Sequence, residues 1–184
     1  MAERHRKGRR AGAEPREVDA DTAMDVAARF LATRPRTRWE LERRLRRAGA
    51  SDDLLGATLD RLTALGHVDD VAFARWWAEQ RDRHAPRGRR MVEAELRQRG
   101  VPREVIEELR GEELSDPVLD AEGLPGTELD RAMVALDRHL RHRPLPTERT
   151  ALQRLGMYLV RRGFSPDTAR DAIRRQQRSA DDTS

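Results

Sequence analysis

Two acidic side chains at the centre of the sequence have a spacing that could support chemistry. Asp69 and Asp70 form a carboxylate pair of the kind used in metal binding or acid–base catalysis. No third ligand lies at a suitable spacing, and both residues stand where a helix is predicted to begin. Asp69 is placed to cap that helix, and Asp70 lies in its electropositive first turn. We therefore expect the pair to be structural.

Histidine and hydroxyl residues lead to a similar interpretation. His139 and His142 are spaced to share one helix face, but neither cysteine nor an acidic motif accompanies them, as a zinc site would require. Thr37, Ser51 and Ser165 each begin a predicted helix and are expected to act as caps rather than nucleophiles. The sequence has neither a glycine-rich phosphate loop nor a Gly-x-Ser-x-Gly turn. We expect no enzymatic activity, no metal and no cofactor.

Arginine supplies almost all of the positive charge. Lys7 is the only lysine among 37 lysines and arginines, the net charge is +4, and the sequence pI is about 10.6. Guanidinium groups favour phosphate and carboxylate partners. The arginines that recur on corresponding predicted helices are Arg36, Arg43, Arg47, Arg90, Arg97, Arg154 and Arg161. They are either solvated faces with ion pairs of about 0.2–0.5 kcal/mol each, or a basic strip that follows a polyanion or an acidic groove.

Composition favours an elongated protein with small cores. Of 184 residues, 37% are hydrophobic and 38% are charged, which is lean for one deep core. The chain has no cysteine, no apolar run long enough to cross a membrane and no signal-peptide pattern. We expect a cytoplasmic protein, and a monomer because coiled-coil heptads are absent.

Helix caps and glycines divide the chain into short helical segments. The predicted organisation is a disordered basic arm (1–20), a three-helix unit (21–66), a second three-helix unit (67–110), an acidic linker (111–126), a third three-helix unit (127–176) and a polar tail (177–184). The stretch from Gly66 to Trp77 is the predicted joint between the first two units. Gly66 ends one helix, and Phe73, Trp76 and Trp77 form an apolar stripe on the next.

The three units share a sequence repeat. Each contains a leucine four residues before a glycine, followed by one apolar residue and a helix-starting residue. The repeated segments are Leu45 to Gly49, Leu96 to Gly100 and Leu159 to Gly163, with Ala50, Val101 and Phe164 as the apolar residues. The apolar residue suits a hydrophobic staple beside the next helix. The sequence therefore predicts an all-α fold, a tandem array of three three-helix units that is elongated and curved.

The unit order and the joint resemble the RecX family of bacterial RecA-recombinase regulators. The family's joint reads roughly Gly-aromatic-[Ile/Leu/Val]-[Asp/Asn]-Asp-x-x-Phe-Ala. This sequence supplies Gly66, Val68, Asp69, Asp70, Phe73 and Ala74, with His67 in place of the aromatic residue. Upstream, the segment from Arg34 to Leu41 is similar to the family's Arg-x-Arg-Ser-x-x-Glu-Leu, with Thr37 in place of serine.

This resemblance implies a protein that lies along the RecA filament on single-stranded DNA and inhibits its ATPase and strand exchange, modulating recombination and DNA repair. The recurring arginines would then meet DNA phosphates or an acidic filament surface. One alternative is a helix-turn-helix transcriptional regulator, although the sequence has no asparagine for reading adenine. Another is a helical adaptor that binds protein alone.

Overall fold

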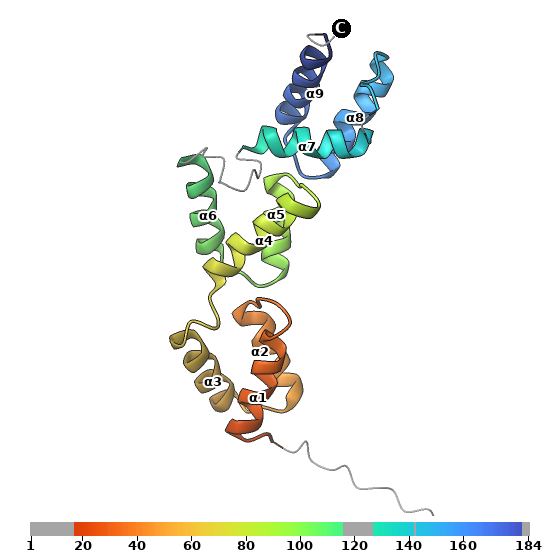
Figure 1. Cartoon of the computed structure of the whole chain (residues 1–184). Helices are drawn as coiled ribbons and strands as arrows, with labels where there is room; N and C mark the ends of the chain where they lie inside the picture. The colour runs from red at the N-terminus through yellow and green to blue at the C-terminus, as the bar shows by residue number, and fades with distance from the viewer. Residues whose placement is uncertain (1–16, 116–126, 142, 182–184) are drawn as a thin grey trace, which may run out of the picture.

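The computed structural model describes residues 17–115, 127–141 and 143–181, and the regular structure within them is α-helical. The helices are α1 (Ala20–Leu31), α2 (Arg38–Ala48), α3 (Asp52–Ala64), α4 (Asp70–His84), α5 (Arg89–Gln98), α6 (Arg103–Ser115), α7 (Glu128–Leu140), α8 (Arg149–Arg161) and α9 (Pro166–Asp181). Figure 1 shows them as three groups of three that follow one another in an extended row.

Each group of three helices has its own hydrophobic core, because the apolar stripes of its helices face one another. The most deeply buried large side chains are Leu41, Leu45 and Leu59 in the first unit, Phe73 and Leu96 in the second, and Leu136, Leu159 and Phe164 in the third. The extensive helix–helix contacts also lie within units. The predicted all-α array of three three-helix units is therefore confirmed, and it is elongated.

Short-range signals account for most helix ends. Thr37, Asp69 and Ser165 each accept a hydrogen bond of 2.8–3.0 Å from a backbone N–H in the first turn of their helix. Ser51 stands at the cap position of α3 but makes no capping bond with its side chain, so that expectation was wrong. Left-handed glycines follow four helices: Gly49, Gly66, Gly100 and Gly163.

Two helices continue further than the sequence predicted. Helix α6 passes Gly111 and reaches Ser115, and α9 passes through the start of the predicted polar tail to Asp181. Glutamate, glutamine and arginine in these segments are good helix formers, so polarity alone did not end either helix. Residues 1–16 of the predicted basic arm and 116–126 of the predicted linker lie outside the described residues.

Candidate nucleic-acid interface

The predicted joint connects the first two units. Gly66, with φ of 72°, turns the chain after α3. Val68 is buried in the core of the first unit, although the predicted boundary assigned it to the second. Phe73, Trp76 and Trp77 form an aromatic cluster in the second unit, with ring centroids 5.6–6.1 Å apart. The chain thus passes directly from one core into the next.

Asp70 bonds the second unit to the first. Its Oδ1 accepts a hydrogen bond of 2.9 Å from the backbone N–H of Arg38, the first residue of α2. Asp69 caps its own helix, α4, whereas Asp70 serves the start of a helix in the preceding unit. Burial raises the pKa of the Asp70 carboxyl, and the bond from Arg38 offsets this only in part.

The same connection recurs between the second and third units. Glu128 is the first residue of α7, as Asp70 is of α4. Its Oε1 accepts a hydrogen bond of 3.3 Å from the backbone N–H of Arg89, the first residue of α5. In both joints, the middle helix of one unit begins against an acidic residue that opens the first helix of the next unit.

A second pair of bonds joins the middle helices themselves. The Thr37 hydroxyl donates to the backbone carbonyl of Arg99 at 2.7 Å, across the first joint. The Gly88 backbone N–H donates to the carbonyl of Arg162 at 2.9 Å, across the second. Thr37 and Gly88 precede α2 and α5, while Arg99 and Arg162 follow α5 and α8. Each middle helix therefore starts where the next one ends.

Two left-handed glycines allow this close approach. A Cβ built on Gly100 would lie 2.4 Å from Cβ and Cγ of Trp39, and one built on Gly163 would lie 2.6 Å from Cβ of Met91. Trp39 and Met91 stand in the first turns of α2 and α5. Glycine is thus required at these positions both for the turn and for contact between units, and the sequence pattern indicated only the turn.

Charged side chains reinforce the first joint. Glu40, whose side chain is 12% exposed, pairs with Arg34 of its own unit at 2.9 Å and with Arg99 of the next at 3.0 Å. Burial raises the pKa of the Glu40 carboxyl, but the hydrogen bond and charge of Arg34 and the charge of Arg99 outweigh burial, so this pKa lies below its ordinary value. The Thr37-x-x-Glu40 capping box forms only its hydroxyl half, because the carboxylate turns to the arginines.

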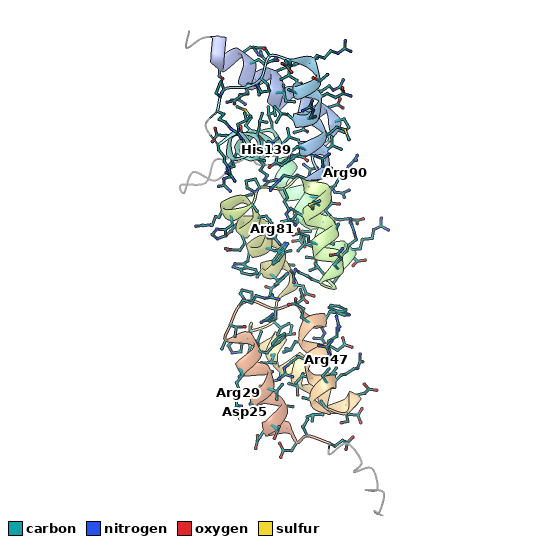
Figure 2. The ribbon with its side chains drawn as sticks, turned by 90° about the vertical axis from the view of Figure 1, so that its right-hand side faces the viewer. Asp25, Arg29, Arg47, Arg81, Arg90 and His139 are labelled. Atoms are coloured by element: carbon teal, nitrogen blue, oxygen red, sulfur yellow. The ribbon has the colours of Figure 1, made fainter. Side chains whose placement is uncertain are left out.

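Trp77 is held by ionic groups on neighbouring segments. Its Nε1 donates to the Glu95 carboxylate at 2.8 Å, and Arg81 Nε donates to the same carboxylate at 2.7 Å. Arg87 also pairs with Glu95. The guanidinium groups of Arg81 and Arg99 lie over the Trp77 ring, 4.2 and 3.8 Å from its centroid. The sequence analysis missed this cluster, which lies inside the second unit (Figure 2).

Some of the predicted strip arginines have partners within the protein. Arg36 precedes α2, and its guanidinium lies 3.9 Å from the centre of the Phe30 ring and donates to the Phe30 carbonyl. Burial, together with the nearby charge of Arg34, lowers the pKa of Arg36. Arg97 pairs with Glu93 at 3.5 Å. Because Arg36 and Arg97 already have partners inside the protein, they are weaker candidates for binding an external anion.

Other predicted arginines are open to solvent. The exposed ones without an ion pair, hydrogen bond or ring contact to another described residue are Arg47, Arg90, Arg154 and Arg161. Figure 2 shows Arg47 and Arg90 in the right-hand half of the array, on successive units. Arg43 lies 4.4 Å over the ring of Trp39, which is 37% exposed. The structure thus places a partly exposed aromatic ring beside one of the predicted arginines, and the sequence pattern did not indicate this ring.

The described residues contain no group of three or more histidine, cysteine, aspartate or glutamate side chains that could hold a metal. His139 stacks on Tyr158 at 3.9 Å between ring centroids. Its predicted helix partner, His142, lies outside the described residues. Among the helices within residues 17–115, 127–141 and 143–181, none is long and apolar enough to span a membrane.

Comparison with known proteins places this architecture in a family. Models of the first, second and third three-helix domains of RecX match residues 23–62, 69–109 and 127–173. The regulatory protein RecX of Mycolicibacterium vanbaalenii is 38% identical over 172 residues, covering 87% of this chain and 88% of its own. That of Mycobacterium avium is 36% identical over 155 residues, covering 83% of each chain.

A solved structure has the same fold. The crystal structure of RecX from Lactobacillus salivarius superposes with a TM-score of 0.70 at 17% identity, covering 86% of this chain and 96% of that one. The domain order, the length matched and the identity to the mycobacterial proteins agree. This chain belongs to the RecX family of regulatory proteins.

Proposed function

We propose that this protein binds the RecA recombinase filament on single-stranded DNA and inhibits its ATPase and strand-exchange activities, thereby modulating recombination and DNA repair. One observation carries the proposal: two joints with corresponding contacts hold the three units in one extended row, and exposed arginines without an ion pair to a described residue lie on the middle helices. A filament offers a repeating surface, and an extended array can contact it at several points.

Several weak contacts are sufficient for such a protein. An exposed ion pair contributes about 0.2–1 kcal/mol. Contacts on linked units act together, because binding of one unit raises the effective concentration of the others at their sites. The joints fix the spacing between units, so that less freedom is lost when the second and third contacts form. No deep ligand pocket is needed for this mode of binding.

We rank the candidate arginines by their exposure and by their partners inside the protein. Arg47 and Arg161 occupy corresponding positions, each two residues before a left-handed glycine, and both are exposed. Arg90 and Arg154 are exposed as well. We assign the contacts with DNA phosphates or the filament to these four residues, and a smaller part to Arg36, Arg43 and Arg97.

The test is the ATPase activity of RecA on single-stranded DNA at near-stoichiometric amounts of the protein. We expect the wild-type chain to inhibit. A variant with Arg47, Arg90, Arg154 and Arg161 changed to glutamine should need about tenfold or more protein for half-inhibition.

The matched control removes the same charge elsewhere. Arg29, Arg103, Arg170 and Arg174 are exposed and pair with an acidic residue on their own helix. Their glutamine variant should inhibit like the wild type. Absence of inhibition by the wild-type chain would refute the proposed function, and equal loss in both variants would refute the assignment of the arginines.

A further inference from the structure

The second joint contains a basic cleft. It has a volume of about 500 Å³ and lies between the end of α4 in the second unit and helices α7 and α8 of the third. Its basic lining residues are His84, Arg138, His139, Arg141, Arg143 and Arg162. No aspartate or glutamate stands among the described residues that line it. Figure 2 shows His139 in the part of the third unit that faces the second.

Three of the four described arginines that line the cleft are held by uncharged groups. Arg138 Nη2 donates to the backbone carbonyl of Arg83 at 3.1 Å, and Arg162 Nη1 donates to that of Pro86 at 2.9 Å. Arg143 Nε donates to the carbonyl of Leu140 at 3.1 Å. A carbonyl satisfies a donor but brings no full negative charge. The guanidinium groups are therefore positioned without being neutralised, and an anion in the cleft would meet several of them.

This arrangement differs from that of other arginines near the joints. Arg131 pairs with Asp82 at 3.1 Å, and Arg110 pairs with Glu93 at 2.6 Å. Those pairs are structural, because each positive charge has a carboxylate partner inside the protein. The contrast indicates that the charge of the cleft serves a partner from outside.

An aromatic pair forms one wall. His139 stacks on Tyr158, and the Tyr158 hydroxyl donates to the Ala135 carbonyl at 3.4 Å. Flat rings beside guanidinium groups suit the sugars and bases of a nucleic-acid strand as well as its phosphates.

Positive charge continues out of the cleft along α8. Arg154 and Arg161 lie four residues before and three residues after Tyr158, so all three share one helix face. Both arginines are exposed and lack a partner among the described residues. A basic surface that extends beyond the cleft fits a continuous strand better than a single small anion.

We propose that this cleft binds the sugar–phosphate backbone of single-stranded nucleic acid, and that the face of α8 guides the strand into it. The choice of ligand rests on the proposed function, in which the protein meets single-stranded DNA. The site itself is independent of any recombinase and is tested without one.

The experiment measures the affinity of the full chain for a fluorescent oligothymidylate by anisotropy over a range of salt concentrations. The test variant is Arg138→Gln with Arg141→Gln, two cleft residues on or just after α7. The control is Arg170→Gln with Arg174→Gln, exposed residues of α9 that remove the same charge from the same unit. Circular dichroism establishes that both variants fold.

We expect the cleft variant to bind more weakly and to lose about 1.4 from the slope of log affinity against log salt, since each lost phosphate contact to a single strand removes about 0.7. The control should retain the wild-type slope. Equal slopes and affinities in the two variants would overturn the site.

Competition identifies the ligand class. An unlabelled oligothymidylate should displace the labelled strand from the wild-type chain far better than inorganic phosphate or thymidine monophosphate at equal phosphate concentration. Equal displacement by those small anions would refute a nucleic-acid strand as the ligand and indicate a free phosphate instead. Equal displacement by polyglutamate of matched charge would refute the same ligand and indicate an acidic protein. A wild-type chain that binds the strand as described but leaves RecA uninhibited would refute the proposed function and retain the cleft.

Discussion

Replacing Gly100 with alanine tests whether the first joint holds the first two units in place. A Cβ at this position would lie 2.4 Å from Cβ and Cγ of Trp39, and the Cβ of Trp39 cannot move without shifting the start of α2. The residue also has φ of 74°. Gly66 is the matched control, because its φ is 72° but a Cβ there would meet nothing within 4 Å.

The two variants separate the cost of the backbone from the cost of the joint. An alanine in the left-handed region costs about 1–2 kcal/mol, and both variants carry this cost. Overpacking against Trp39 adds about 1–3 kcal/mol to Gly100→Ala alone. An excess of that size shifts the balance between docked and undocked units by about 5–150-fold. Because each unit has its own core, we expect undocking rather than unfolding of the first two units.

Two measurements follow this change in the full-length chain. Small-angle X-ray scattering should give a larger radius of gyration for Gly100→Ala than for Gly66→Ala or the wild type. Tryptophan fluorescence should change in parallel, since Trp39 contacts Gly100 and the Trp77 ring lies under Arg99. If the two variants have the same scattering profile and the same unfolding free energy, the contact between Trp39 and Gly100 does not hold the units, and the reasoning fails.

Three further substitutions make predictions that urea denaturation can test. Glu40→Gln should lower the free energy of unfolding by about 1–3 kcal/mol at neutral pH. The folded pKa of Glu40 lies below its ordinary value of 4.5, so the stabilisation by its carboxylate is present above pH 4.5 and is lost as the pH falls through the lowered pKa. The unfolding free energies of the variant and the wild type should therefore converge in acid. Thr37→Val should cost about 1–3 kcal/mol, because it removes both the cap of α2 and the 2.7 Å bond to Arg99, and equal stability would contradict the bond. Gly56→Ala should stabilise by about 0.5–1 kcal/mol, since this glycine lies within α3 with nothing within 4 Å of its missing Cβ, and a loss of stability would show that the site is crowded.

The helices and their grouping could be predicted because their signals are local. A leucine spaced before a glycine marks the end of a middle helix in every unit, and the buried Leu45, Leu96 and Leu159 occupy that position. Capping residues marked most of the starts. One start departs from this pattern: Ser51 has the right residue type and place, but its side chain makes no capping hydrogen bond.

The joints could not be predicted, because their partners are far apart in the sequence. The bond from Thr37 to Arg99 spans 62 residues, and the bond from Arg38 to Asp70 spans 32. A hydroxyl or carboxylate at a helix start already has a local role, so the pattern gives no reason to expect a second one. Glu40 illustrates the ambiguity: its spacing fits a capping box, yet the approach of Arg99 from the next unit gives its carboxylate a charged partner.

The distinction between free and engaged arginines depends on the same long-range geometry. Arg36 and Arg47 look alike in the sequence, as cations near either end of the second helix. Arg36 stacks on Phe30 and is partly buried, whereas Arg47 faces solvent. The ring beneath Arg36, Phe30, belongs to the preceding helix. The partners of Arg99, which are Glu40 and Trp77, belong to two different units. Composition and periodicity cannot supply this information.

The three repeat glycines differ in the segment that they meet. Gly100 and Gly163 each lie against the first turn of the middle helix of the preceding unit, at Trp39 and Met91. Gly49 holds the same place in the first unit, and its carbonyl accepts a hydrogen bond of 3.3 Å from the backbone N–H of Val18, just before α1. One sequence signal therefore has a partner inside its own unit in one case and a partner from another unit in two, and only the long-range geometry distinguishes these cases.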